Sequence, residues 1–144
     1  MWDKMNGTNP MADAELAWQN IKGTTRMFRW HHFSGERTIK IHPTQKPTQL
    51  YKWLLENYVI CKSCKGRGGY YEDVAGDGGS QMWQHCEDCN GESPKVLDTH
   101  LGSGSIAIAC HYLNCDLVGY EIDKEYYDAA CKRFKEQTAQ QALW

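Results

Sequence analysis

The chain lacks a long apolar run, an excess of positive charge and an even number of cysteines, and each absence narrows its function. No stretch of the 144 residues is apolar over the length of a membrane span, and the N-terminus lacks the basic start and apolar core of a signal peptide. We therefore expect a cytoplasmic protein with no membrane partner. The net charge of −2 is not the basic footprint of a nucleic-acid binder, so any DNA contact requires a local patch.

The cysteines indicate a metal site. Seven is an odd count, which argues against a fully paired disulfide framework. Two Cys-x-x-Cys pairs, separated by 21 residues, have the spacing of a structural four-thiolate zinc site: Cys61, Cys64, Cys86 and Cys89. A glycine follows two residues after each pair and lets backbone amides point back at the sulfurs. We expect structural Zn²⁺ here, with a redox pair or free thiols as the alternative, and we expect Cys110, Cys115 and Cys131 to pack as small core residues.

Changes in composition divide the chain into residues 1–60, 61–94 and 95–144. In the first part we expect short strands over 14–18, 26–30 and 39–41, and then a helix that starts near Pro47 and has an apolar face of Leu50, Trp53, Leu54 and Tyr58. The middle part is rich in glycine, has few aliphatic residues and shows no periodicity, which is typical of an insert.

The last part has the pattern of a nucleotide-binding βαβ unit. Strands are expected over 95–98 and 117–121, a helix over about 105–113, and a second helix with Tyr127, Ala130, Phe134 and Thr138 on one face. Gly102 and Gly104 allow a sharp turn between the first strand and its helix, with room for a ligand beside the backbone. Glu121 ends the second strand, where its carboxylate can accept two hydrogen bonds from ribose hydroxyls.

The glycine turn fits two kinds of cofactor. Gly102-x-Gly104-x-x-Ala107 satisfies the dinucleotide fingerprint, so an NAD-dependent oxidoreductase stays open as an alternative. Asp98, directly before the turn, suits a cofactor with a cationic amino group and a sulfonium, and it would repel a pyrophosphate.

Three segments together resemble the N6-adenine/N4-cytosine DNA methyltransferase family, in the permuted class whose catalytic motif comes first. They are His42-Pro-Thr-Gln-Lys-Pro47, Asp98-Thr-His-Leu-Gly-Ser-Gly-Ser105 and Glu121-Ile-Asp-Lys-Glu-Tyr-Tyr-Asp128. The similarity covers nearly the whole chain outside the insert. It implies an α/β class: a partial Rossmann-like fold of the S-adenosylmethionine-dependent methyltransferases with a zinc-knuckle insert, encoded by a bacterium or a phage.

The resemblance also implies cofactor-binding roles. Asp98 and the turn of Gly102, Ser103 and Gly104 would hold the methionine part of S-adenosylmethionine, and Glu121 would hold the ribose. The adenine would pack on Ile122, with Asp123 nearby. The segment with His42, Thr44 and Lys46 would close over the methionine end from the other side. His100 replaces the commoner aromatic residue of this cofactor site and is expected to pack without exchanging protons.

The catalytic motif of the family, Asp/Asn/Ser-Pro-Pro-aromatic, is missing. The four prolines, at positions 10, 43, 47 and 94, are nowhere adjacent, so we assign no catalytic residue. In the permuted class the motif should lie upstream of Trp2. We therefore expect a C-terminal portion that is inactive alone and associates with a complementary N-terminal piece or as a homodimer, since an incomplete sheet exposes its edges.

The local charge predicts two contact surfaces. Residues Lys22 to Lys46 carry six cations and one acid, a balance of +5, with interleaved aromatic residues, and are the candidate contact for the backbone of double-stranded DNA. The insert has acids and no Lys or Arg between Glu72 and Glu92, which favours a structural or protein-contacting role. Its first knuckle is similar to the cysteine-rich repeat of J-domain co-chaperones, so a zinc-binding adaptor or chaperone-like module without enzymatic activity remains the alternative function.

Overall fold

The computed structural model describes residues 1–5, 12–31, 40–74, 76 and 79–139. Ten elements follow one another along these residues: β1 (Trp2–Asp3), β2 (Ala14–Glu15), β3 (Phe28–Arg29), α1 (Thr48–Tyr58), β4 (Gly69–Asp73), β5 (Gln81–His85), β6 (Lys95–Asp98), α2 (Ser105–Tyr112), β7 (Asp116–Gly119) and α3 (Lys124–Thr138).

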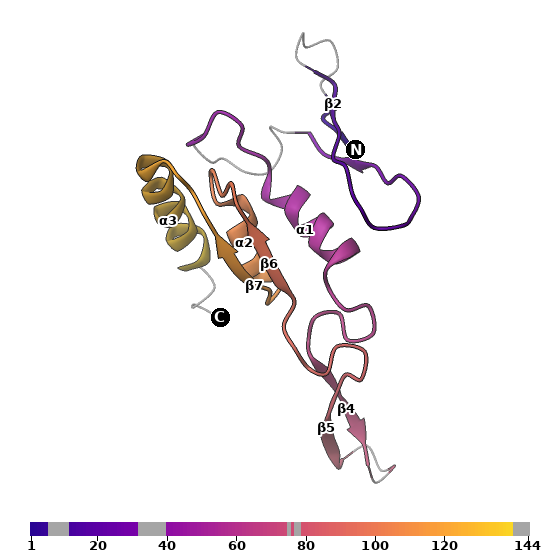
Figure 1. The fold of residues 1–144 in the computed structure, drawn as a ribbon. Helices are drawn as coiled ribbons and strands as arrows, with labels where there is room; N and C mark the ends of the chain where they lie inside the picture. The colour runs from indigo at the N-terminus through magenta and orange to yellow at the C-terminus, as the bar shows by residue number, and fades with distance from the viewer. Residues whose placement is uncertain (6–11, 32–39, 75, 77–78, 140–144) are drawn as a thin grey trace.

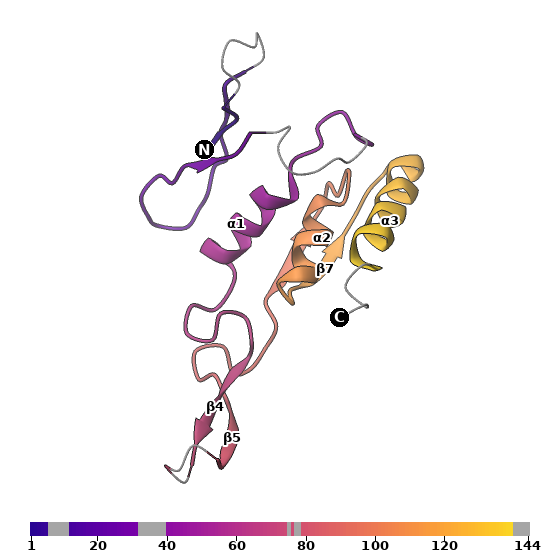
Figure 2. The same cartoon turned by 180° about the vertical axis from the view of Figure 1, so that it is seen from behind.

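The described elements form an elongated molecule (Figure 1). A small sheet with the order β2-β1-β3 lies at one end, and the antiparallel β4–β5 hairpin extends from the other end. The helices and the parallel β6–β7 pair lie between them, an arrangement that is equally clear in the reverse view (Figure 2). Residues 22–31, the first part of the predicted DNA contact, are therefore at the opposite end of the molecule from the insert.

The central unit is β6–α2–β7–α3. Its two strands are parallel, with Lys95 opposite Asp116 and Asp98 opposite Gly119. Parallel strands require a crossover, and α2 supplies it. The predicted α/β class, with strand, glycine turn, helix, strand and helix in sequence, is confirmed.

One face of the β6–β7 pair is covered and the other is bare. Val96 and Leu117 point toward the helices and pack against the core. On the opposite face Leu97 is 65% exposed, Val118 55% and Tyr120 61%. Parallel sheets are normally covered on both faces, whereas this apolar face has no covering layer among the residues that the structure describes.

The core lies where α1 packs on α2. Leu55 of α1 is 3% exposed and contacts a buried cluster that includes Ala109 and Cys110 of α2 and Cys115. Cys110 and Cys115 are thus core residues, as predicted, and burial raises the pKa of Cys110 to about 12. The predicted apolar face of α1 is not the one that contacts this cluster: Trp53 and Tyr58 contact aromatic neighbours outside it, and the contact is made by Leu55 and Tyr51 instead.

Two other predictions differ from the structure. The predicted strands over 14–18 and 26–30 shrink to two-residue strands, and residues 40 and 41 of the third form none, its residue 39 being outside the described part. The insert, expected to be irregular, contains the β4–β5 hairpin, in which Tyr71 pairs with Trp83 at a ring-centroid distance of 5.0 Å. The high glycine content hid the aromatic strand residues on both sides of its tip.

None of the helices in the described part of the chain has the length and apolar character that crossing a bilayer requires.

Leu55→Ala should lower the free energy of unfolding by about 2–5 kcal/mol, because it opens a cavity between α1 and α2. Urea unfolding followed by far-ultraviolet circular dichroism measures this change. Leu16→Ala is the matched control, since Leu16 is 84% exposed and its truncation should change stability by less than about 0.5 kcal/mol. Equal effects of the two substitutions would contradict this placement of the core.

Candidate functional site

The glycine turn joins the carboxyl end of β6 to the start of α2. Gly102 has φ +53° and Gly104 has φ +69°, both in the left-handed region where a Cβ is strained. The turn is closed by the amide of Gly104, which donates to the carbonyl of Leu101 at 3.0 Å. Leu101 is itself fixed to the end of β7, because its amide donates to the carbonyl of Tyr120 at 2.8 Å.

Glu121 lies against this turn. Its Oε2 accepts the Gly102 amide at 2.8 Å and its Oε1 accepts the Asp123 amide at 3.1 Å. The hydrogen bonds from Asp123 and Gly102 lower the pKa of Glu121, so the group is a carboxylate at neutral pH. A carboxylate offers about four lone-pair sites, and two amides leave acceptor capacity for further donors. The two features predicted at opposite ends of the cofactor are therefore in direct contact.

The neighbours of Glu121 have distinct roles. Ile122 is fully exposed at 103%, as suits an apolar platform that another group covers. Asp123 caps α3, because its Oδ1 accepts the amides of Glu125 and Tyr126 at 2.8 and 3.1 Å. Capping accounts for Asp123 without a ligand.

Asp98 and His100 sit on the exposed side of the turn. Asp98 Oδ1 accepts the His100 amide at 2.9 Å, which shapes the backbone that leaves β6. The His100 ring lies 2.9 Å from the hydroxyl of Thr99 through Nδ1. His100 is exposed, so the packing that was predicted for it does not occur within the described residues.

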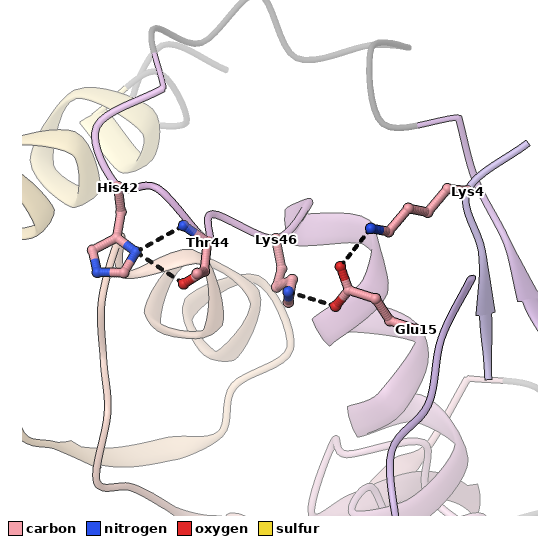
Figure 3. Close-up of polar contacts among 5 residues, drawn as sticks. All are labelled: Lys4, Glu15, His42, Thr44 and Lys46. Carbon is pink, nitrogen blue, oxygen red and sulfur yellow. Dashed lines mark hydrogen bonds and ion pairs between the residues drawn. The ribbon is translucent and has the colours of Figure 1, made fainter. Parts of the chain in front are cut away.

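The segment with His42, Thr44 and Lys46 lies over the turn although about 60 residues separate them in sequence. A Cβ on Gly102 would be 3.6 Å from the His42 imidazole. His42 Nδ1 accepts the Thr44 amide at 3.3 Å (Figure 3). The His42 ring meets Tyr126 edge-on, with ring centroids 4.4 Å apart. The carbonyl of Lys46 accepts the Ser105 hydroxyl at 2.7 Å. The structure thus brings together the predicted residues of this segment and of the turn.

Glu15 joins this segment to the N-terminal sheet. Its carboxylate lies between two lysines, 2.8 Å from Lys4 Nζ and 2.5 Å from Lys46 Nζ (Figure 3). Partial burial raises the pKa of Glu15, but hydrogen bonds and charge attraction from both lysines outweigh it, and the net shift is downward. Sequence reasoning assigned Lys46 to a cofactor and missed Glu15, because no local pattern pairs residues 31 positions apart.

Two further residues at the site were missed. Tyr126 touches His42, as described above, and Arg133 reaches the turn from α3 with Nη1 2.9 Å from the Ser103 carbonyl oxygen. Arg133 occupies an inward position of α3, three residues after the buried Ala130. The signal for Arg133 in the sequence was a positively charged residue at a helical position that faces the core.

A cavity of about 490 Å³ lies between α2, α3 and the edge of β7. Its lining includes Leu101 and Gly104 of the turn and Phe134 of α3, but not Asp98, Glu121 or His42. The cavity therefore shares Gly104 with the predicted cofactor residues but lies on the α3 side of the turn, away from Asp98, Glu121 and His42.

The four clustered cysteines form the candidate metal centre. Their sulfurs all lie within 4.8 Å of one another, with 3.7 Å between Cys61 and Cys86 and 3.6 Å between Cys64 and Cys89. A tetrahedron with zinc–sulfur bonds of about 2.3 Å has sulfur–sulfur edges of about 3.8 Å, so this spacing fits zinc. His85, directly before Cys86, is outside the cluster of possible ligands found among the described residues.

The knuckles have the backbone that thiolate ligation needs. Gly66 and Gly91 have φ of +78° and +75°, and the Gly66 and Gly68 amides bond Cys64 while that of Gly91 bonds Cys89. Burial raises the pKa of Cys64, but hydrogen bonds from Cys89 and Gly68 outweigh burial and lower the pKa of Cys64 to about 7, whereas burial raises the pKa of Cys89 to about 12. Amides directed at sulfur stabilise thiolates, which are the form that binds metal.

The basic segment is partly neutralised in the fold. Arg29 pairs with Asp3 at 3.4 Å, and Lys46 pairs with Glu15. Arg26 donates a hydrogen bond to the Asn57 side chain at 2.9 Å. Because asparagine is neutral, this contact does not neutralise the charge of Arg26. Residues 32–39 of this segment, with Arg37, lie outside the described part. The balance of +5 counted along the sequence therefore overstates the positive charge available on this surface.

Comparison with known proteins gives a consistent set of matches. The family model described as DNA methylase, N6_N4_Mtase, matches residues 4–132. The type II methyltransferase M.HpaI of Haemophilus parainfluenzae is 28% identical over 117 residues, 79% of this chain and 27% of that protein. The chain thus spans about a quarter of the length of this curated relative. The crystal structure of the M1.HpyAVI–SAM complex matches 82% of this chain and 42% of that chain, with 24% identity and a TM-score of 0.45.

Glu15→Gln should remove a pH-dependent contribution to stability. A carboxyl whose pKa is lowered by folding stabilises the fold above its unfolded value near 4.5, and this stabilisation is lost as the pH falls through the folded pKa. We expect the variant to be less stable than the wild type at pH 7, by about 0.2–1 kcal/mol because the pair is a third exposed. The free energies of unfolding of the variant and the wild type, measured with urea, should converge below pH 4.5. A difference that is constant with pH would contradict this ion-pair assignment.

Proposed function

Because the chain belongs to the N6/N4 DNA methylase family, we propose that it is the cofactor-binding portion of an S-adenosylmethionine-dependent DNA methyltransferase. The observation that carries this proposal is the meeting of three segments at the carboxyl ends of β6 and β7. The glycine turn, Glu121 and His42 are mutual neighbours there, with Gly102 at the centre. Ligands of open α/β sheets bind at this edge.

The residues fit the chemistry of this cofactor. Glu121 is ionised and keeps acceptor capacity for the two ribose hydroxyls, while the exposed Ile122 beside it offers an apolar surface for the adenine. Asp98 supplies negative charge next to the turn, where a sulfonium and an amino group are favoured and a pyrophosphate is not. The turn of Gly102, Ser103 and Gly104 and the segment with His42, Thr44 and Lys46 would enclose the methionine part. We propose that His100 lies at the edge of the cofactor site and that Asp123 caps α3.

The proposed reaction transfers the cofactor's methyl group to an exocyclic amino group of adenine or cytosine in DNA. The catalytic Pro-Pro-aromatic motif would come from a complementary N-terminal piece, since no such sequence occurs in the chain. The bare face of β6–β7, with Leu97, Val118 and Tyr120, is the surface we propose for that piece or a second copy. We place the protein in the cytoplasm of a bacterium or of a phage-infected cell.

We also propose that the cysteine cluster binds structural zinc. The sulfur spacing and the amide contacts support this, and four thiolates complete a tetrahedron without an open position for catalysis. The hairpin beyond the zinc exposes Tyr71 at 67% and Trp83 at 40% on one face. Its acidic residues disfavour phosphates, so we assign residues 61–94 to protein contact and the basic segment Lys22 to Lys46 to the DNA backbone.

S-Adenosylhomocysteine, the demethylated cofactor, should bind to the chain, and Glu121→Gln should weaken this binding at least about tenfold. Glutamine keeps the shape but turns an amide nitrogen toward one of the two donating amides and loses an ionised acceptor. Isothermal titration calorimetry measures both affinities, with Glu125→Gln as the control because Glu125 is exposed in the first turn of α3. Unchanged affinity in Glu121→Gln would contradict the ribose assignment, and NADH binding in a parallel titration would favour the oxidoreductase alternative.

One zinc ion should bind each chain, and Cys86→Ser should abolish stoichiometric zinc while Cys131→Ser retains it. Cys131 lies on α3, outside the cluster, and controls for loss of a thiol. Plasma mass spectrometry of the purified chains gives the metal content. Because zinc binding is coupled to folding of such knuckles, removal by a chelator should increase amide exchange in residues 61–94 and spare α2. Full metal content in Cys86→Ser would rule out this ligand set.

A further inference from the structure

A buried guanidinium lies directly behind the glycine turn. Arg133 of α3 is only 5% exposed, whereas arginine is almost never fully buried unless it is paired. Removing a guanidinium from water is costly, so its N–H groups must find good acceptors inside the protein. The acceptors of Arg133 therefore show which segments of the chain it connects.

Arg133 bonds the turn and the start of α1 at the same time. Its Nη1 donates to the Ser103 carbonyl at 2.9 Å and to the Ser105 hydroxyl at 2.8 Å. Its Nη2 is 3.4 Å from the hydroxyl of Thr48, the first residue of α1. Ser103, Ser105 and Thr48 are 2–5% exposed, so these bonds are shielded from water.

The Ser105 hydroxyl extends this network to the segment that covers the turn. It donates its proton to the carbonyl of Lys46 at 2.7 Å, so it must receive the Arg133 bond through its lone pairs. The turn and the His42–Lys46 segment, which are the two walls of the proposed cofactor site, are therefore both connected to one guanidinium. A planar guanidinium carries its donors on separate nitrogens, so it can bridge acceptors that lie too far apart for all of them to bond one ammonium nitrogen.

Ala130 completes the contact one turn earlier on the same face of α3. A Cβ on Gly104 would lie 3.2 Å from the Ala130 Cβ, so α3 packs tightly against the turn. Ser103, whose carbonyl Arg133 holds, stands between two glycines in the left-handed region. Glycines allow that backbone conformation but do not select it, because they also occupy many others. Contacts around the turn select it, and α3 supplies those of Arg133 and Ala130.

We propose that Arg133 is a positioning residue for the cofactor site. It sets the shape of the 102–105 turn and the spacing between this turn and the His42–Lys46 segment, and it acts from behind without touching the cofactor. This inference rests on the proposed function, since the spacing matters only if a ligand binds between these walls.

The test compares Arg133→Met and Arg133→Lys with Lys132→Met in the 144-residue chain. Lys132→Met removes a charge from the exposed side of α3, where Lys132 is 4.0 Å from Glu136. Calorimetry gives the affinity for S-adenosylhomocysteine at a temperature where each variant is folded. Hydrogen exchange of the ligand-free chain gives the protection of residues 102–106 relative to the α1–α2 core. Ser105→Ala, which removes one acceptor and no charge, is the fallback if Arg133→Met does not fold.

Arg133→Met should lose at least about tenfold in affinity and lose protection selectively at residues 102–106, because two charge-assisted hydrogen bonds disappear. Arg133→Lys should restore part of both, and Lys132→Met should match the wild type. An affinity of Arg133→Met within about twofold of the wild type, or a loss of protection spread evenly over the chain, overturns the proposal. If the wild type binds no S-adenosylhomocysteine, the proposed function fails, whereas the exchange of the ligand-free turn still decides whether Arg133 positions it.

Discussion

The hydrogen bond from the Gly102 amide to the Glu121 carboxylate, 2.8 Å long, is the contact on which the site depends. It links the ends of β6 and β7, together with the bond from the Leu101 amide to the Tyr120 carbonyl. It also fixes the negative charge of Glu121 beside a backbone that carries no side chain, so a ligand can approach both groups together. The same carboxylate accepts the Asp123 amide and thus sets where α3 begins.

The remaining contacts hold this pair between two supports. From behind, α3 presses Ala130 against Gly104 and bonds Ser103 through Arg133. From the front, the His42–Lys46 segment covers Gly102, and Glu15 holds Lys46 toward the N-terminal sheet. Glu121, α3 and the His42–Lys46 segment converge on a single turn, while the four-cysteine segment and its hairpin extend away from it. The glycine turn is expected of a member of this family. The insert, in contrast, is organised around four cysteine sulfurs.

The sequence predicted what depends on local pattern. The strand–turn–helix order of residues 95–144, the four-cysteine cluster and the buried Cys110 and Cys115 all follow from spacing and apolar periodicity, and the structure contains them. It did not predict the β4–β5 hairpin, where glycines masked an aromatic strand pattern. It also did not predict the partners of Lys46 and Arg133, because contacts between residues 31 and 30 positions apart, such as those with Glu15 and Ser103, depend on how elements pack.

The most direct test of this account is a crystal structure of the chain with S-adenosylhomocysteine bound. The account requires the ribose hydroxyls within hydrogen-bonding distance of the Glu121 carboxylate, the adenine on Ile122 and the homocysteine end between His42 and the 102–104 turn. A nucleoside bound elsewhere, for example in the cavity behind the turn, or a Glu121 carboxylate that contacts no part of it, would contradict the account.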